Sequence, residues 1–451
     1  MARALLATVV LLTWTTAVTA SSPRYLTGSP RSSCRPAGFP AADKVCSALD
    51  ASIHSAIANH TAPGMGAAVV NTRVSPSRAF LEYHTGSGGF TYDDTAARVT
   101  ADTTLWDMAS CSKIMATTTA TAQLYQRGFL GLDTKLCDPS LLGPAFANQG
   151  KADITVRNLM LHNAGFPPDP NPGYSSPLFP CPQNSNYHPG QDFSCHDQIL
   201  NNLLFNQSIV TPPGSVYVYS DLSMITMMFA IGSLVRTHAA TLLPPATDPH
   251  AKRPYRMPPL CDDQPDSNLI CFYYAYVKFN VFDRFGLTHT DFVPTDATVC
   301  PPQWADPWYH HALIAGYVSD QNAYAMGGVA GHAGVFTTVQ DTVRFMAIWM
   351  GQIGDESLNA TTRSLFTTIA NITQSSRALG WDTNDQPDPP CGNMSAKTFL
   401  HIGYTGTEFC GDPETGIFTV LLANGRYPNY LVDGMIQYRP VFGSLVQQLL
   451  E

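Results

Sequence analysis

Hydrophobic patterns near both ends of the chain predict a sheet. Over residues 43–59, apolar side chains recur at four-residue steps, which predicts an amphipathic helix. Short apolar runs at 64–70 and 79–83, separated by a polar turn, predict two strands. Far along the chain, residues 397–406 and 416–424 alternate or run apolar in the manner of sheet strands.

The middle of the chain has mostly helical patterns. Residues 110–126 suit a buried helix that Gly128 ends, and residues 130–330 are mainly helix and loop. Amphipathic helices are also predicted at 339–350 and 435–450. We therefore expect an α+β fold, in which the strands of the two ends pair in one antiparallel sheet flanked by helices. The middle would form an inserted, mainly helical lobe, with the active site in the cleft between the lobes.

The first residues have the layout of a secretory signal peptide. A short positive start precedes an uncharged, apolar stretch that ends in small residues, so we expect cleavage after Ala20. A membrane anchor is the alternative, but this stretch is short for a span of about 20 residues. The expected division is a signal peptide at 1–20, an irregular leader at 21–40 and a single domain at 41–451. Its sheet lobe would take about 41–112 and 335–451, and its helical lobe about 113–334.

Charge and composition narrow the class of partner. Lys and Arg number 25 against 34 Asp and Glu, which gives a net charge of −9. Because no basic run is present, nucleic acid is not an expected partner. The run Met224–Val235 is too short to span a membrane and suits a buried helix.

Several sequence features agree with export from the cell. Five N-x-[ST] sequons occur, at Asn59, Asn206, Asn359, Asn371 and Asn393. The eleven cysteines would pair in an oxidising compartment, and an odd number leaves at least one unpaired. Cys181 with Cys195, and Cys261 with Cys271, are close in sequence and are predicted bridges. A zinc site is the alternative, but no paired ligand spacing occurs, and adjacent residues such as His310 and His311 point in different directions.

Three short motifs carry candidate chemistry. Ser110 and Lys113 are three positions apart at a helix start, so the lysine amine can reach the serine hydroxyl. Tyr219 and Asp221 follow a Pro-Pro-Gly turn, and a lysine ammonium near the tyrosine would favour its phenolate. His401-Ile402-Gly403-Tyr404 suggests a strand edge where glycine admits a substrate backbone. Taken singly, each motif also fits a structural role, as a solvated lysine, a packing tyrosine or a glycine-rich hairpin.

Together and in this order, the motifs resemble those of the β-lactamase-related serine hydrolases, which combine S-x-x-K, Y-x-N or Y-x-D, and K-T-G or H-x-G. The likeness extends over about residues 50–445 and includes the segments 105–110, 127–133, 157–165, 327–338 and 401–407. The resemblance implies an antiparallel sheet with helices on both faces, an all-helical lobe, and neither a metal nor an organic cofactor. It implies acyl transfer on a small-molecule ester or amide substrate.

The resemblance also implies a role for each residue. Ser110 would be the nucleophile and Lys113 its activating partner. Tyr219 would be the general base and the acid to the leaving group, and Asp221 would contact Lys113 and the substrate. The N–H groups of Ser110 and Tyr404 would form the oxyanion hole beside Gly403. His401 would occupy the third motif, which lies on a late strand, whereas the competing His332 is expected only at the cleft edge.

Two departures from the family pattern bear on the substrate. His401 replaces a lysine, so it supplies little positive charge near neutral pH, and Asp221 replaces an asparagine and adds negative charge. Both changes favour esters or uncharged amides. A β-lactamase or a D-amino-acid peptidase remains an alternative, and an inactive secreted binding protein is the alternative of a different class.

Cys111 is predicted to be the unpaired thiol. It lies next to Ser110, and a disulfide partner within about 7 Å between Cα atoms would crowd the cleft floor. The other ten cysteines could then form up to five bridges.

Overall fold

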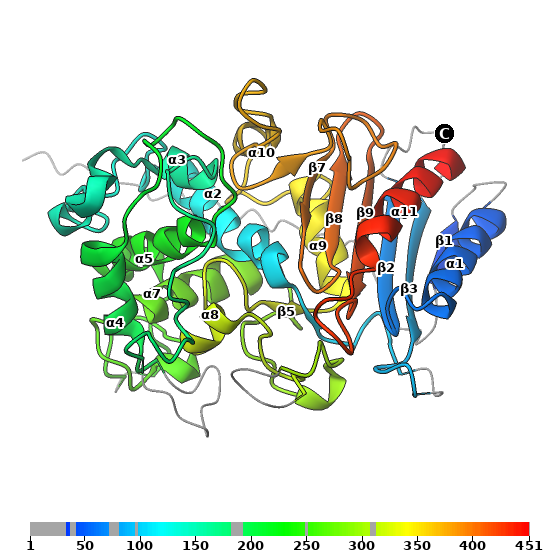
Figure 1. The fold of residues 1–451 in the computed structure, drawn as a ribbon, viewed down its shortest axis with the longest axis horizontal. Coiled ribbons are helices and arrows are strands. Elements are labelled where there is room, and N and C mark those ends of the chain that lie inside the picture. The colour runs from blue at the N-terminus through cyan, green and yellow to red at the C-terminus, as the bar shows by residue number, and fades with distance from the viewer. Residues whose placement is uncertain are drawn as a thin grey trace, which may run out of the picture.

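The computed structural model describes residues 33–36, 42–71, 81–94, 98–181, 193–248, 251–306 and 313–450 (Figure 1). The expected signal peptide, most of the expected leader, and the adjacent His310 and His311 lie outside these residues.

One antiparallel sheet contains the strands of both chain ends. Across the described residues it has seven strands in the order β1-β3-β2-β9-β8-β7-β6. The central pair is β2 with β9, in register from Met65 opposite Ala423 to Asn71 opposite Ile417. This pairing confirms the expected closure of the sheet by the two ends of the chain. The strands are Ser33–Pro36 (β1), Gly64–Asn71 (β2), Leu81–Gly88 (β3), Asp382–Thr383 (β6), Phe399–Ile402 (β7), Glu408–Asp412 (β8) and Ile417–Ala423 (β9).

Helices cover both faces of the sheet, which confirms the expected α+β class. The first helix α1 (Ala42–Ala58) and the last helix α11 (Met435–Leu450) lie on one face, and α9 (Val339–Trp349) lies on the other (Figure 1). The predicted apolar positions of α1 are buried, or at Ile57 partly buried, against side chains of α11 such as Phe442. Gly66 admits α9 closely, because a Cβ there would come within 2.5 Å of Val339 Cγ2.

The inserted lobe is built around a buried pair of helices, α5 (Asp221–Thr237) and α7 (Leu269–Tyr276). Every side chain of α5 from Leu222 to Val235 is buried, as expected for its apolar run. No helix in the described part of the chain is long and apolar enough to cross a membrane. Gly232 allows the close contact with α7, since a Cβ there would lie 2.2 Å from the carbonyl oxygen of Leu269.

Shorter elements complete the lobe and its junction with the sheet. The α-helices are Thr119–Gln126 (α2), Val156–Met160 (α3), His196–Asn201 (α4), Ala239–Leu242 (α6), Gln321–Ala325 (α8) and Ala360–Thr367 (α10). The 3₁₀ segments are Ala109–Cys111, Pro144–Asp153, Pro259–Cys261 and Ala297–Val299, and the π segments are Lys113–Thr118, Asn202–Asn206 and Val277–Phe282. A small second sheet pairs β4 (Trp106–Asp107) with β5 (Phe336–Thr337).

Two sequence-based boundaries need correction. Residues 33–36 of the expected irregular leader form β1, which pairs with β3 from Ser33 opposite His84 to Pro36 opposite Leu81. The open backbone edge of β3 specifies this strand, and a proline is tolerated in an edge strand. The expected single helix at 110–126 is a 3₁₀ turn, a π segment and an α-helix in succession.

The cysteines confirm both predicted bridges. Cys181 pairs with Cys195 and Cys261 with Cys271, a third bridge joins Cys391 to Cys410, and Cys46 is also disulfide-bonded. Cys111 is unpaired as expected, but the prediction that it is the one unpaired thiol is wrong. Cys137 and Cys300 are also unpaired, and their thiols donate to the backbone carbonyls of Ala152 and Asp296.

These thiols should differ in reactivity. Burial raises the pKa of both Cys111 and Cys300 to about 12, whereas Cys137 is only half-buried. Since the thiolate is the reactive form, iodoacetamide at neutral pH should alkylate Cys137 in the native protein and spare the other two. Unfolding without a reductant should expose all three to the reagent. Peptide mass mapping checks this, and native labelling of Cys111, or its recovery in a disulfide, would contradict the assignment.

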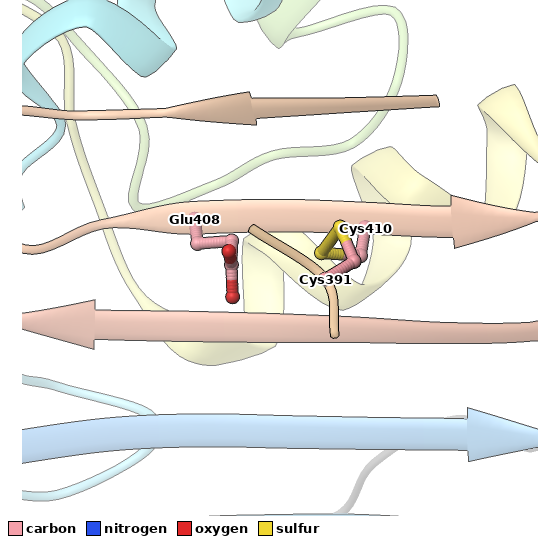
Figure 2. A group of neighbouring side chains, drawn as sticks. All are labelled: Cys391, Glu408 and Cys410. Atoms are coloured by element: carbon pink, nitrogen blue, oxygen red, sulfur yellow. A yellow bond between two sulfur atoms is a disulfide. The ribbon is translucent and has the colours of Figure 1, made fainter. Parts of the chain in front are cut away.

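Glu408 is a buried carboxyl on β8, beside the Cys391–Cys410 disulfide (Figure 2). Burial raises its pKa from 4.5 to about 8, although the positive charge of Arg439 opposes the shift. Between these two pKa values the unfolded chain ionises Glu408 while the folded protein keeps the proton. The contribution of Glu408 to the free energy of unfolding therefore falls as the pH rises from about 4.5 to about 8.

We expect Glu408→Gln to become progressively more stable than the natural protein over this pH range. The difference should grow by up to about 1.4 kcal/mol per pH unit, because the amide cannot ionise in either state. Urea unfolding at pH 5 and at pH 8 measures it. Glu356→Gln, at an exposed carboxyl, is the matched control and should show no such growth. A gain for Glu408→Gln that is equal at both pH values would show that Glu408 is not held protonated.

Candidate active site

Ser110 lies at a strained turn that follows β4. The preceding residue Ala109 has φ of 45°, a left-handed conformation that costs an L-residue roughly 1–2 kcal/mol. The buried carboxylate of Asp107 secures the turn, because it accepts the N–H of Ala109 at 2.9 Å and that of Ser319 at 2.8 Å. The turn leaves Ser110 half-buried, whereas the next three side chains are buried.

Lys113 is completely buried, and its ammonium group has three acceptors. Nζ lies 2.8 Å from Ser110 Oγ, 2.7 Å from Asp221 Oδ1 and 3.0 Å from the backbone oxygen of His332. Burial disfavours the ammonium, but Asp221 and Tyr219 outweigh it, so the pKa of Lys113 is raised. Because the ammonium donates to Ser110 Oγ, the hydroxyl's own proton is available to another acceptor.

Tyr219 lies beside this pair, just before α5. Its ring centroid is 5.1 Å from Lys113 Nζ and 4.7 Å from the ring of His162, a buried residue that the sequence analysis did not single out. Burial raises the pKa of Tyr219 and outweighs the opposing charge of Lys113. The Lys113 ammonium favours the phenolate, as expected, but burial has the larger effect, so the Tyr219 phenol is harder to ionise than a free tyrosine side chain. Neighbour identity alone did not reveal how far the surrounding chain removes the phenol from water.

His401 is buried at the end of β7, near Tyr219, with 6.3 Å between the two ring centroids. Its Nδ1 lies 3.0 Å from the carbonyl oxygen of Ile402, while its buried Nε2 has no partner among the described residues. Burial, followed by the charges of Arg377 and Lys113, lowers its pKa well below 6.5. The imidazole is therefore neutral, and it supplies no fixed cation.

Gly403 and Tyr404 form the turn after β7. A Cβ at Gly403 would lie 2.0 Å from Thr407 Oγ1 and 2.6 Å from the carbonyl oxygen of Met108, so only glycine fits this close approach. The Gly403 N–H donates to the carbonyl oxygen of Thr407 at 2.8 Å. The tight approach places the turn against the Met108–Ser110 segment.

Two cavities meet at Ser110, Tyr219 and Tyr404. One, of about 370 Å³, also reaches Arg377, His401 and the side chains of α11; the other, of about 490 Å³, reaches Asp221, Trp304 and Asp320. Ser110 therefore has open space on two sides.

His332 does not lie at the cleft edge, as was expected. Its side chain is completely buried, and Nε2 lies 2.9 Å from Asp320 Oδ1. Burial opposes its positive charge, but Asp320 and Asp221 outweigh burial and raise its pKa. The segment that carries it, between α8 and β5, passes behind Lys113 and contributes a backbone carbonyl.

Three arginines of the smaller cavity, Arg377, Arg426 and Arg439, were missed by the sequence analysis, and two of them are buried. Arg377 is buried, lies 3.1 Å from Asp382, and places its guanidinium carbon 5.2 Å from the ring centroid of Tyr219. Arg439 of α11 is also buried, and it donates to the carbonyl oxygens of Gly403 at 2.8 Å and Thr407 at 3.3 Å. The apolar neighbours of Arg439 on a predicted helix could have indicated that this arginine is buried. Arg377 lies in a loop whose sequence has no such hydrophobic pattern.

Two groups of side chains within the described residues have atoms close enough to share a metal ion. In the first, Cys391 and Cys410 are bonded to each other beside Glu408, so neither offers a thiolate (Figure 2). In the second, Asp221 is paired with Lys113, and Asp320 with His332. Both groups are thus occupied by interactions within the protein.

The chain is similar to known proteins in sequence and in fold. The proteins named "Putative D-alanyl-D-alanine carboxypeptidase" from Escherichia coli strains K12 and O157:H7 are 27% and 28% identical, over 77% of this chain and 76% of their own. The solved structure titled "EstCE1, a hydrolase with promiscuous acyltransferase activity" has a TM-score of 0.59 at 17% identity, over 88% of this chain and 99% of its own. A class C beta lactamase from Rhodobacter sphaeroides has a TM-score of 0.58 at 18% identity, over 90% and 99%.

The sequence model of a single family covers most of the chain. The model described as Beta-lactamase matches residues 49–243 and 273–439, which include all three motifs. The chain therefore belongs to the Beta-lactamase family and is a serine hydrolase of the acyl-enzyme class.

Proposed function

We propose that the protein cleaves uncharged esters or amides through an acyl-enzyme on Ser110. The main support for this substrate class is that the charged side chains around the cleft are paired with one another. Arg377 is paired with Asp382 at 3.1 Å and Arg426 with Asp433 at 2.6 Å. On the other side of Ser110, Asp221 is paired with Lys113 and Asp320 with His332, at 2.7 and 2.9 Å.

Arg439 is the remaining charged side chain that lines either cavity, and it is engaged with the backbone of the Gly403 turn. His401 adds no charge. A charged substrate group would therefore compete with partners that the protein already supplies, and desolvating such a group without a partner is costly. An uncharged ester or amide incurs no such cost.

The proposed chemistry begins with attack of Ser110 Oγ on the substrate carbonyl carbon. Tyr219 Oη receives the serine proton as it passes its own proton to the leaving oxygen or nitrogen, and the bond to that atom breaks. The alcohol or amine departs, Ser110 carries the acyl group, and Tyr219 regains its starting state. Water then takes the place of the leaving group and reverses the proton path. Lys113 stays charged and stabilises negative charge that develops on Ser110 Oγ and Tyr219 Oη.

The negative charge that develops on the carbonyl oxygen also needs donors. In this proposal the backbone N–H groups of Ser110 and Tyr404 form the oxyanion hole. The Gly403 N–H is already donated to Thr407, and Arg439 holds the Gly403 carbonyl, so the turn that carries Tyr404 is supported from two sides.

A second candidate is a D-alanyl-D-alanine carboxypeptidase. The names of the E. coli relatives suggest it, and one feature of the cleft favours it. Arg377 Nη1 is buried and has no hydrogen-bond partner among the described residues, so it could bind a substrate carboxylate. Its pairing with Asp382 weakens this alternative, since part of the arginine's charge is already compensated.

Secretion is part of the proposal. All five sequon asparagines are exposed, which a glycan requires. Disulfides occur in both lobes: Cys181–Cys195 and Cys261–Cys271 lie in the helical lobe, and Cys391–Cys410 lies in the sheet lobe. Such bridges persist in an oxidising compartment. Intact mass of the protein secreted by a eukaryotic host, before and after glycosidase treatment, tests the use of the sequons.

We expect Ser110→Ala to abolish labelling by a fluorophosphonate probe and to lower ester hydrolysis by several orders of magnitude, because the nucleophile is lost. Ser364→Ala, at an exposed serine of α10, is the matched control and should keep both. Lys113→Met should also lose activity, but it leaves Asp221 without its partner. The double variant Lys113→Met/Asp221→Asn restores neutrality, so an inactive but folded double variant separates catalysis from folding. Hydrolysis that survives Ser110→Ala would refute the mechanism.

His401→Lys should change substrate preference. A fixed cation in the smaller cavity would raise kcat/KM for a carboxylate-bearing β-lactam, relative to a neutral ester, by about ten- to a hundredfold. His401→Gln keeps the position neutral and serves as the control, with an unchanged ratio. The natural protein should prefer the neutral ester over both a β-lactam and an acyl-D-alanyl-D-alanine peptide. Faster turnover of the acyl-D-alanyl-D-alanine peptide would instead support the second candidate, and faster turnover of the β-lactam would support a β-lactamase.

A further inference from the structure

Large apolar side chains are exposed in the lining of the smaller cavity and on a loop that contributes to it. Ile402, Tyr404 and Ile436 line that cavity and are 39, 45 and 58% exposed. Leu431 and Val432, on the loop between β9 and α11, are 72 and 42% exposed. We call these five residues the apolar rim.

The apolar rim is fixed to the site by Arg426. This side chain donates to the carbonyl oxygens of Tyr404, Tyr430 and Val432, at 2.8, 3.1 and 3.3 Å. Its guanidinium carbon lies 3.7 Å from the ring centroid of Tyr404, whose hydroxyl donates to the carbonyl oxygen of Tyr430 at 3.1 Å. The loop that carries Leu431 and Val432 is therefore tied to the residue that follows Gly403.

We propose that the apolar rim binds a hydrocarbon chain of the substrate, so that the preferred substrates are esters with an apolar chain of several carbons. This inference rests on the proposed ester hydrolysis. It commits to a chain of the reacting molecule because three of the five rim residues line the cavity that contains Ser110. A chain attached to the reacting ester reaches them without leaving the cleft, and apolar contact there would remove exposed hydrocarbon from water.

The test compares p-nitrophenyl esters from acetate to octanoate, with alkyl acetates as the series that varies the alcohol. All substrates are kept at concentrations where they are monomeric. In at least one series kcat/KM should rise with chain length, by up to about fourfold for each methylene that becomes buried. Ile436→Ser and Leu431→Ser should each flatten that rise, measured as the ratio of long-chain to acetate kcat/KM. Val441→Ser is the matched control, because Val441 is 59% exposed on the same helix as Ile436 and neither lines the cavity nor lies on the loop that Arg426 holds.

The outcomes separate this inference from the proposed function. A protein that neither cleaves p-nitrophenyl acetate nor reacts with a fluorophosphonate would refute ester hydrolysis itself. A protein that cleaves the acetate but has a flat chain-length profile in both series would overturn the role of the rim alone. A rise that Ile436→Ser and Leu431→Ser leave intact would also overturn it. A rise that begins only above the aggregation concentration of the ester would point to a lipid surface instead, and would equally contradict the proposal.

Discussion

The buried ammonium of Lys113 is the constraint on which the rest of the site depends. A charge removed from water needs close partners, and loss of one partner from a buried pair typically costs about 3–5 kcal/mol. The acceptors come from three separate parts of the chain, namely the turn after β4, the start of α5 and the segment before β5. The sheet and the helical lobe must therefore meet at Lys113, and the same meeting places Ser110 and Tyr219 together.

Around this centre, charge is balanced locally. Lys113, His332, Arg377 and Arg426 each have a carboxylate within 3.1 Å, while His401 is held neutral by burial. In the proposed mechanism, neutral Tyr219 and charged Lys113 define the resting state, and a proton moves through Tyr219 in each chemical step. The strained Ala109 turn contributes to this arrangement, because the Asp107 carboxylate holds it and thereby sets the position of Ser110.

Local patterns were sufficient to predict the main elements and the motif positions. Periodicity located α1, α11 and the terminal strands, and the three-residue spacing of Ser110 and Lys113 anticipated their 2.8 Å contact. The features that were missed depend on distant contacts. β1 forms on the open edge of β3, and Arg377 becomes part of the cleft only because its loop packs against Tyr217 and Asp382. The neutral state of Tyr219 follows from burial by segments that lie far apart in the sequence.

The covalent intermediate is the most direct test of the central claim. A p-nitrophenyl ester is mixed with the protein and quenched in acid within the first turnover, and the acyl group is located by peptide mass spectrometry. We predict one acyl group per chain, on the peptide that contains Ser110, together with a burst of p-nitrophenol of the same stoichiometry. An acyl group on another residue would contradict the assignment of Ser110 as the nucleophile. If deacylation is slow, hydrolysis with neither a trapped acyl-enzyme nor a burst would contradict it as well.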